Sequence, residues 1–348
     1  MIDTVGFAVK SPSAAPELFR FQRRDLGPDD VLIDIDYCGI CHTDIHHARN
    51  KWGDAIYPMV VGHEIVGRVK DVGSAVTEFK QGERVGVGCL SNSCGSCPNC
   101  LAGEEQYCSK HTVWTYNSTE ADGVTPTYGG YSKHIVINRH FVLRIPENLN
   151  PAAAAPLLGA GIGAWSPLRH WGVGRGYIIA IIGLGGVGHL AVKLASSLGA
   201  EVTVLSTDYS KAEDAAALGA RHFVDIRSGE LPGLRDKFDF VMNCSAYDID
   251  ITPYLETLKV DGSMVLVGNA RQTAALYFNS LISRRRTVSG SLAGGIEETQ
   301  KMLNYCGENN ITADIELVPL NEVGEAWKRI QRGNARYRYV ADVAGFKE

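Results

Sequence analysis

Four cysteines are spaced for binding a metal ion. They follow the pattern C-x2-C-x2-C-x7-C, at Cys94, Cys97, Cys100 and Cys108. Four thiolates at such spacing close a tetrahedral shell around Zn²⁺, which is typical of a structural rather than a catalytic zinc. An iron–sulfur cluster also takes four cysteines and is the main alternative. Either interpretation is favoured over four thiols without a metal in a surface loop.

A second group of metal-ligating residues lies in two earlier segments, CGICHTDIH and GHEIVG. Cys41 and His63 would supply one thiolate and one imidazole, which suit a zinc site with an open position. Asp44 is expected to accept the other ring N–H of His63 and so fix its tautomer. Thr43 and then His46 are predicted to carry the proton of a metal-bound alcohol towards solvent. Each residue alone is more often structural, but their joint occurrence favours a catalytic site.

A glycine-rich pattern, G-x-G-x-x-G, lies between a predicted strand and a predicted helix. Its residues are Gly183, Leu184, Gly185, Gly186, Val187 and Gly188. The glycines would let backbone N–H groups approach a pyrophosphate at the positive end of the helix. A tight turn without a ligand is disfavoured, because a long strand–helix alternation follows.

The end of the next predicted strand decides between NAD and NADP. NAD sites place a carboxylate there for the ribose 2′-hydroxyl, whereas NADP sites need neutral or cationic donors. Ser206 occupies this position, followed by Thr207 and then Lys211, and these groups could hold a 2′-phosphate. Asp208 lies at about the distance expected for an NAD-binding acid, roughly 20 residues after the last glycine. We interpret Asp208 as a solvated turn residue and predict NADP(H).

Two regions that differ in their predicted secondary structure are expected to position the metal-ligating and cofactor-binding residues. The first is rich in short strands, as in the alternation of apolar and polar residues over 31–37. Its expected strands lie at 31–37, 65–69, 85–88 and within 131–145. A helix near 297–306 is expected to return the chain to this region. The pattern favours a β-rich domain with long functional loops.

The second region alternates apolar strands with amphipathic helices, which predicts a parallel, doubly wound sheet and an α/β fold. Leu190, Leu194 and Leu198 recur at helical spacing, and Ser210 with Glu213 resembles a capping box. The expected strands lie at 177–182, 201–207, 223–226, 238–243 and 264–267. We place one domain at 1–150 with 289–348, and the dinucleotide-binding domain at 151–288.

Composition narrows the possible partners. The 348 residues are 45% hydrophobic and 21% charged, with a net charge of −5. This balance disfavours nucleic acid or an anionic membrane as a partner, and no apolar stretch is long enough to span a membrane. The beginning of the chain does not look like a signal peptide. Nine cysteines without such a peptide favour thiols and metal over disulfides, so we expect a cytoplasmic protein.

Taken together, these segments and the final ARYRYV resemble the zinc-dependent medium-chain alcohol dehydrogenases, in the branch of cinnamyl alcohol dehydrogenases and microbial NADP-dependent aldehyde reductases. The resemblance covers nearly the whole chain. It implies a GroES-like catalytic domain, an inserted Rossmann domain, a homodimer and reversible reduction of aromatic and aliphatic aldehydes by NADPH. It also favours zinc over an iron–sulfur cluster. Trp52, Tyr57, Trp114 and Tyr116 would then be candidate walls of an apolar substrate pocket, with core packing as the alternative.

The sequence departs from this family at Gly159. Similar enzymes supply a third zinc ligand from a cysteine in a stretch resembling APLLCAG, where this chain reads APLLGAG. Glycine has no side chain to bind a metal. In one interpretation zinc is held by Cys41, His63 and Glu64, because a carboxylate is an acceptable zinc ligand. In the other, the catalytic zinc is lost.

Three functions therefore remain open. The leading hypothesis is an NADP-dependent alcohol dehydrogenase or aldehyde reductase whose catalytic zinc is weakened by Gly159. The second is a zinc-poor NADPH reductase of activated C=C or C=N (iminium) bonds. The third is a non-catalytic NADPH-binding protein or a redox sensor that uses the cysteine-rich lobe. It is disfavoured by the presence of four residues suited to catalysis, namely Thr43, Asp44, His46 and Glu64.

Overall fold

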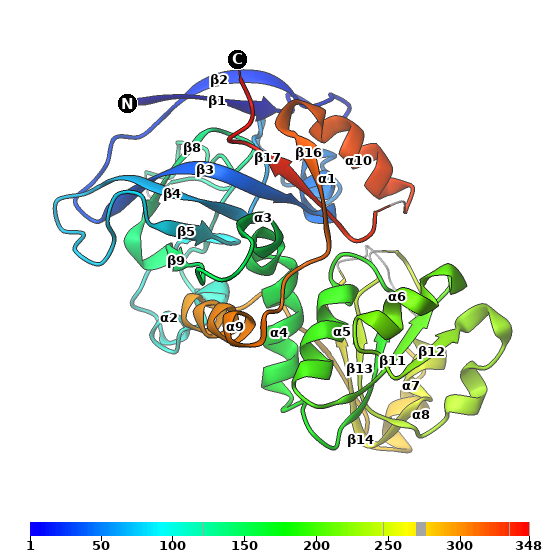
Figure 1. Ribbon diagram of the computed structural model, residues 1–348. Coiled ribbons are helices and arrows are strands. Elements are labelled where there is room, and N and C mark those ends of the chain that lie inside the picture. The colour runs from blue at the N-terminus through cyan, green and yellow to red at the C-terminus, as the bar shows by residue number, and fades with distance from the viewer. Residues whose placement is uncertain (121, 246, 269–275, 334, 348) are drawn as a thin grey trace. The chain divides into compact units, whose positions relative to one another are not determined.

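The computed structural model describes residues 1–120, 122–245, 247–268, 276–333 and 335–347 (Figure 1). The chain forms two compact units, Met1–Ile162 with Gly294–Glu348, and Gly163–Ala293. Both combine helices and strands, which confirms the predicted α/β fold class. Among the helices of the described residues, none is both long and apolar enough to cross a membrane.

The first unit is built around the long strand β3 (Asp30–Ile40), which pairs antiparallel with β4 (Ile65–Val72). The main sheet has the order β16-β17-β3-β4-β5-β9, and β8 also pairs with β3. The other strands of this unit are β1 (Ile2–Ala8), β2 (Glu17–Arg23), β5 (Arg84–Val87), β6 (Leu90–Asn92), β7 (Val113–Trp114), β8 (His134–Asn138), β9 (Leu143–Arg144), β16 (Ile315–Pro319) and β17 (Arg338–Asp342). The predicted strands are thus present with small shifts at their ends.

Short helices connect these strands. The α-helices are α1 (His42–Ala48), α2 (Pro98–Leu101), α3 (Pro151–Ala154), α9 (Ile296–Asn309) and α10 (Val323–Gln331), and the 3-10 helices are η1 (Glu105–Tyr107), η2 (Arg139–Phe141), η3 (Ala155–Leu158) and η7 (Leu320–Glu322). Helix α4 (Ala160–His170) begins in the first unit and ends in the second. The expected helix near 297–306 is α9.

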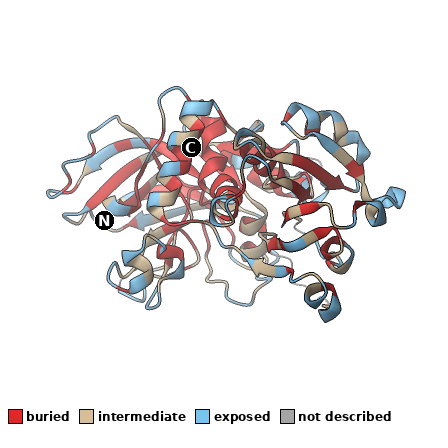
Figure 2. Ribbon diagram, turned by 90° about the horizontal axis from the view of Figure 1, so that it is seen from below, coloured by how far each residue is buried: buried red, intermediate tan, exposed pale blue. Residues whose placement is uncertain are grey.

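Residues that alternate along β3 form part of the core of the first unit. Val31, Ile33 and Ile35 are buried as the alternation predicts, but Leu32 is buried too. The reason is that β3 is a central strand with β4, β8 and β17 as neighbours. Figure 2 shows the sheet strands largely buried and the connecting loops largely exposed.

The second unit contains one parallel sheet with the strand order β12-β11-β10-β13-β14-β15. Numbered along the chain this order is 3-2-1-4-5-6, the arrangement of doubly wound dinucleotide-binding folds. Its elements are β10 (Ile178–Ile182), α5 (Gly188–Ser197), β11 (Glu201–Ser206), η4 (Tyr209–Lys211), α6 (Ala212–Ala217), β12 (His222–Asp225), η5 (Ile226–Ser228), η6 (Leu231–Leu234), β13 (Phe238–Asn243), α7 (Thr252–Leu255), β14 (Leu258–Leu266), α8 (Phe278–Ile282) and β15 (Thr287–Gly290). Leu190 and Leu194 of α5 are fully buried, and α5 packs on β10 and β11.

The boundaries between the two compact units lie after residues 162 and 293, whereas the sequence led us to expect them after residues 150 and 288. Two contacts account for the difference. Helices α3 and η3 pack on strands β3, β4 and β17 of the first unit, and β15 extends the second sheet as far as Gly290. The assignment of cofactor binding to the second unit stays a prediction.

The predicted capping box of Ser210 and Glu213 is wrong. Asp208 precedes the 3-10 turn η4, and its carboxylate accepts the backbone N–H of Ser210 at 3.1 Å. Glu213 lies in the first turn of α6, whose N-cap residue is Lys211. An Asp at the start of the turn satisfies an otherwise unpaired N–H group as well as Ser would.

Candidate active site and metal centres

The four cysteines of the C-x2-C-x2-C-x7-C pattern converge in the loop that holds α2 and η1. Their sulfur atoms all lie within 4.8 Å of one another. The Sγ atom of Cys100 is 3.5 Å from that of Cys97 and 3.9 Å from that of Cys94. A disulfide would require about 2.05 Å, whereas the sulfurs of a zinc–thiolate tetrahedron lie about 3.8 Å apart. The residues therefore fit a tetrahedral metal.

Backbone N–H groups stabilise a thiolate in this cluster. Hydrogen bonds from the backbone at Cys100 and Ser109 lower the pKa of the Cys97 thiol to about 5. Desolvation raises the pKa of Cys100 to about 11, so this thiol would give up its proton when a metal binds. None of the nine cysteines, all of which the structure describes, forms a disulfide.

The second predicted metal cluster also comes together. Cys41 precedes α1, and His63 and Glu64 lie directly before β4. Because Cys38 of β3 pairs with Ile65 of β4, the two segments reach the same end of the sheet. One ligand atom from each of Cys41, His63 and Glu64 lies within 4.8 Å of the others. The structure thus brings the residues together, while their role as ligands stays a prediction.

Asp44 holds the imidazole of His63. Its Oδ1 atom lies 3.1 Å from His63 Nδ1, and its Oδ2 atom accepts the backbone N–H of Cys41 at 2.9 Å. Tyr131 donates its hydroxyl to the same carboxylate at 3.3 Å. With Nδ1–H directed at Asp44, Nε2 of His63 is left for a metal.

The buried groups of this network shift one another's pKa values. Burial alone would raise the pKa of Asp44, but the His63 imidazole lowers it. Burial would lower the pKa of His63, but the nearby Cys89 and Asp44 raise it well above its usual value. Burial would likewise raise the pKa of Cys41, but the hydrogen bond from His63 and the charges of Arg338 and His63 together lower it below its usual value. A bound metal must therefore displace the proton of His63.

Glu64 is buried and engaged by Arg338, a residue that the sequence did not single out. The Arg338 guanidinium donates to Glu64 Oε2, and the backbone N–H of Ala160 donates to Oε1 at 3.0 Å. Both side chains are almost completely buried. Arg338 lies beside the cluster because Tyr339 of β17 pairs with Ile40 of β3. With 274 positions between the partners, no local sequence signal could identify the pair.

Gly159 lies between η3 and α4, next to this carboxylate. Its φ of −126° is open to any residue, so its conformation does not require glycine. The lack of space does require glycine, because a Cβ atom here would lie 2.5 Å from Glu64 Oε1 and 2.8 Å from Glu64 Cγ. A Cβ atom on Gly39 would also overlap with Glu64. The Glu64 carboxylate therefore fills the space between two glycines.

The predicted proton-transfer residues Thr43 and His46 both lie on α1 and are partly exposed. Their spacing of three residues puts them on the same side of the helix. Burial and nearby Lys51 lower the pKa of His46, so its ring is neutral at pH 7. Within the part of the chain that the structure describes, its Nδ1 atom is buried without a hydrogen-bond partner.

Aromatic rings surround this histidine-rich segment. Trp52 packs edge-on against His46, with 5.4 Å between ring centroids, and also against His47 at 4.5 Å. Tyr116 lies 5.8 Å from the His63 ring. Of the predicted pocket walls, Tyr116 thus lies next to a residue of the metal cluster, and Trp52 packs on the predicted proton-transfer residue His46.

The glycine loop of the second unit has the features that a bound pyrophosphate would need. Gly183 has a φ of +87°, and a Cβ atom on Gly188 would overlap with the Gly183 carbonyl oxygen. A Cβ atom on Gly185, by contrast, would meet no protein atom within 4 Å. Gly183 thus allows the tight turn, Gly188 allows close packing of the helix, and Gly185 leaves room for a ligand to approach the backbone.

The residues predicted to choose the cofactor lie beside this loop. The Lys211 ammonium donates a hydrogen bond to the Leu184 carbonyl oxygen at 3.1 Å. The Ser206 hydroxyl lies at the end of β11 and accepts the backbone N–H of Asp208 at 3.2 Å. Because Asp208 caps η4, its carboxylate already serves the backbone. Thr207 is exposed.

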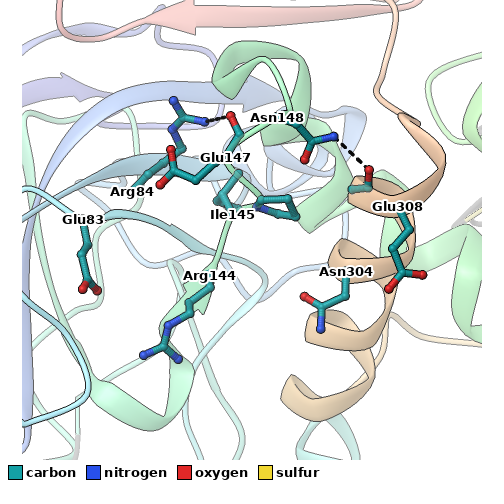
Figure 3. Close-up of a pocket in the computed structure, with 10 residues that line it drawn as sticks. Glu83, Arg84, Arg144, Ile145, Glu147, Asn148, Asn304 and Glu308 are labelled. Atoms are coloured by element: carbon teal, nitrogen blue, oxygen red, sulfur yellow. Dashed lines mark hydrogen bonds between the residues drawn. The ribbon is translucent and has the colours of Figure 1, made fainter.

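A polar hollow elsewhere in the first unit contains none of the predicted site residues. Its volume is about 660 Å³, and its walls come from residues 83–84, 144–148, 304 and 307–308 (Figure 3). Arg84 donates to the Glu147 carbonyl oxygen at 3.2 Å, and Asn148 donates to that of Gly307 at 2.9 Å. Since these polar groups already bind one another, the hollow gives no indication of a catalytic role.

Comparison with known proteins identifies the family. Residues 27–147 match the alcohol dehydrogenase GroES-like domain, and residues 186–307 match the zinc-binding dehydrogenase family. The chain is 48% identical to a probable formaldehyde dehydrogenase, AdhA, of Bacillus subtilis, over 97% of each protein. It is 47% identical to NADP-dependent alcohol dehydrogenase C 1 of Mycolicibacterium smegmatis, over 93% of each.

The chain belongs to the zinc-dependent medium-chain alcohol dehydrogenases. Among solved structures it is similar to a cinnamyl alcohol dehydrogenase of Sorghum bicolor, with a TM-score of 0.96, 39% identity and 99% coverage of both chains. The resemblance deduced from the motifs, including its branch, is thereby confirmed. In this alcohol dehydrogenase, the parallel sheet of the second unit is the Rossmann-type fold and the first unit is the GroES-like fold.

Proposed function

We propose that this alcohol dehydrogenase transfers hydride between NADPH and an aromatic or aliphatic aldehyde. We further propose that its catalytic zinc is bound by Cys41, His63 and Glu64 and is weakened by Gly159. The observation that carries the proposal is the convergence of these three ligand atoms within 4.8 Å, with Asp44 placed on the free ring nitrogen of His63. The four-cysteine cluster at Cys94, Cys97, Cys100 and Cys108 is proposed to hold a structural zinc.

The residues of the chain would divide the reaction as follows. Zinc, when bound, would polarise the aldehyde oxygen as a Lewis acid, and NADPH would supply the hydride. Asp44 keeps the His63 ring oriented for the metal. Thr43 would donate a proton to the alkoxide oxygen, and His46 would replace that proton from solvent. A neutral His46 ring with a buried Nδ1 atom suits this relay.

The proposed NADP(H) site uses Gly183, Leu184, Gly185, Gly186, Val187 and Gly188 for the pyrophosphate and Ser206, Thr207 and Lys211 for the 2′-phosphate. Support comes from the ammonium of Lys211, which lies against the glycine loop. Further support comes from Asp208, whose carboxylate binds the Ser210 N–H. The NADP dependence in the name of the M. smegmatis relative points the same way.

Gly159 favours one further candidate function. If two protein ligands and a carboxylate tied to Arg338 cannot retain zinc, carbonyl reduction would be slow. Reduction of an already polarised C=C or iminium bond by NADPH would then be the main activity, because such bonds need no Lewis acid. Thr43 would remain the proton donor.

One experiment separates these functions: the zinc content of the purified chain, measured alongside NADPH oxidation with benzaldehyde, which offers a carbonyl group but no activated C=C bond outside its aromatic ring. Nearly two zinc ions per chain with aldehyde turnover is the expected result. About one zinc per chain, with turnover only of conjugated or iminium substrates, would select the second function. Tight NADPH binding with no turnover of any acceptor would contradict both and favour a non-catalytic role.

We also propose that the protein is a cytoplasmic homodimer. Among the strands of the described residues, β15 lies at the edge of the parallel sheet, and an edge strand can pair with a second copy. Nine cysteines without a disulfide suit a reducing compartment. Light scattering during size exclusion, giving the mass of one chain instead of two, would refute the dimer.

A further inference from the structure

Tyr131 is fully buried beside the backbone that leads to His63. Its N–H donates to the Val61 carbonyl oxygen at 3.0 Å, and its own carbonyl oxygen accepts the Phe7 N–H at 2.8 Å. Gly62, the residue before His63, has a φ of +106°, and a Cβ atom there would lie 2.8 Å from Cδ1 of the Tyr131 ring. The tyrosine is therefore packed directly against the segment that carries the imidazole of the metal cluster.

The Tyr131 hydroxyl has two partners with opposite roles. The indole N–H of Trp327, on α10, can only donate, so the hydroxyl oxygen accepts this bond at 3.3 Å. The hydroxyl proton is thus left for Asp44 Oδ2, also at 3.3 Å. Burial and the charge of Asp44 raise the pKa of Tyr131 well above its usual value, so the proton stays on the phenol oxygen at neutral pH.

The two hydrogen bonds are long, but burial protects them. Tyr131 and Asp44 are 0% exposed and Trp327 is 2% exposed, so bulk solvent does not compete for these groups. Hydrogen bonds are stronger in such a low-dielectric interior than in water, and an unpaired polar atom there is costly. The chain from the indole through the phenol to the carboxylate is therefore expected to hold its geometry.

Asp44 has both of its oxygens engaged as a result. Oδ1 faces His63 Nδ1 at 3.1 Å, while Oδ2 accepts the Cys41 N–H at 2.9 Å and the Tyr131 hydroxyl. Rotation of the carboxylate away from the imidazole would break both bonds at Oδ2. Since the Cys41 N–H belongs to the backbone, Tyr131 is the side chain on which this restraint depends.

We infer that Tyr131 is a positioning residue for the proposed catalytic metal site, because it restrains His63 from two sides. Its ring supports Gly62 in the preceding backbone, and its hydroxyl fixes Asp44 on the ring nitrogen that does not bind the metal. Tyr131 itself touches neither the metal nor the substrate, and the proposed ligand set is unchanged. The inference rests on the proposed function, because it requires a metal at this site.

Tyr131→Phe tests the role of the hydroxyl, because it keeps the ring against Gly62 and removes only the donor to Asp44. Residues that orient a ligand histidine typically contribute tenfold or more to metal affinity, so the zinc of this site should bind about tenfold more weakly. Competition with a chromogenic chelator measures this affinity. The kcat for benzaldehyde reduction should fall with the KM for NADPH unchanged. Tyr177→Phe is the matched control and should retain wild-type zinc affinity, since its hydroxyl donates to the Trp171 carbonyl oxygen in the second unit, at 3.4 Å.

A double-mutant cycle tests whether Tyr131 acts through Asp44. In an Asp44→Ala background the hydroxyl has no carboxylate to hold, so adding Tyr131→Phe should have little further effect on zinc affinity. A loss of affinity that is as large in this background as in the wild type would overturn the route through Asp44.

Stability separates positioning from a merely structural role. If Tyr131→Phe lowers the free energy of unfolding but binds both zinc ions with wild-type affinity, the tyrosine only stabilises the fold and the inference is wrong, while the proposed metal site stands. A wild-type protein that binds one zinc ion, lost on mutation of the four-cysteine cluster, would overturn the proposed catalytic site and the role of Tyr131 together.

Discussion

The carboxylate of Glu64 occupies the space that a side chain on Gly159 would need. An ideal Cβ atom at position 159 would lie 2.5 Å from Glu64 Oε1 and 2.8 Å from Glu64 Cγ, both too close for any real contact to persist without movement. Glu64 is prevented from moving away by Arg338 on its other oxygen. The glycine at position 159 and the placement of the carboxylate are therefore two aspects of one arrangement.

This relationship predicts that Gly159→Ala destabilises the first unit. The added methyl group must push a buried, ion-paired carboxylate, and overpacking of this kind costs about 1–3 kcal/mol in free energy of unfolding. Urea denaturation of both proteins measures the difference. Gly163→Ala is the matched control, because a Cβ atom at this helical position meets nothing within 4 Å and should leave stability unchanged or slightly raised. Equal stability of Gly159→Ala and wild type would contradict the steric argument.

A second prediction concerns the ion pair itself. Arg338→Met should cost about 3–5 kcal/mol, because it leaves the Glu64 carboxylate buried without its partner. Adding Glu64→Gln should recover much of that loss. A double-mutant cycle in the free energy of unfolding measures the coupling. If the two single losses simply add, Arg338 does not act through Glu64.

The stability loss expected for Arg338→Met should depend on pH. Burial raises the pKa of Glu64 above its usual value, although Arg338 opposes this. A carboxyl group whose pKa is raised on folding favours the folded state most at low pH, and this contribution is lost as the pH rises through the folded-state pKa. Removing Arg338 raises that pKa further. The loss of stability in Arg338→Met should therefore be larger at about pH 8 than at about pH 5.

Local patterns explain why much of the fold and of the candidate site could be predicted. The strand over 238–243 and the glycine loop have signals confined to a few neighbouring residues, and the four cysteines lie within one loop. Cys41 and His63 could be paired because both occur in recognisable segments. The sequence analysis missed the cap at Asp208, because Ser210 and Glu213 also have the spacing of a capping box. Choosing between the two caps requires knowing where β11 ends.

The remaining contacts depend on strand register between distant segments. Arg338 reaches Cys41 and Glu64 only because β17 pairs with β3. Cys89 lies near position 158 because a turn packs on η3, and no sequence spacing indicates this contact. The steric link between Gly159 and Glu64 likewise needs coordinates, since the sequence shows only that position 159 is a glycine.

A third prediction addresses the four-cysteine cluster. Cys97→Ser removes one ligand from a closed tetrahedral shell, so the chain should lose about one zinc ion. The surrounding loop, which contains only short helices and the two-residue strand β7, should then become open to limited proteolysis. Zinc analysis and mapping of the cleavage sites measure both effects. Cys244→Ser, outside the cluster, should retain its zinc and resist cleavage; retention of zinc by Cys97→Ser would refute a four-thiolate site.

The last prediction concerns the choice of cofactor. Ser206→Asp places a carboxylate at the end of β11, where it would repel a 2′-phosphate but accept a hydrogen bond from a ribose 2′-hydroxyl. The ratio of kcat/KM for NADPH to that for NADH should fall about a hundredfold, which corresponds to about 2.8 kcal/mol. Lys211→Met should weaken NADPH use and leave NADH use nearly unchanged, because only the phosphate needs the ammonium. Steady-state kinetics with both cofactors measures these ratios. A wild-type enzyme that uses NADH at least as well as NADPH would instead show that Asp208, despite capping η4, binds the ribose.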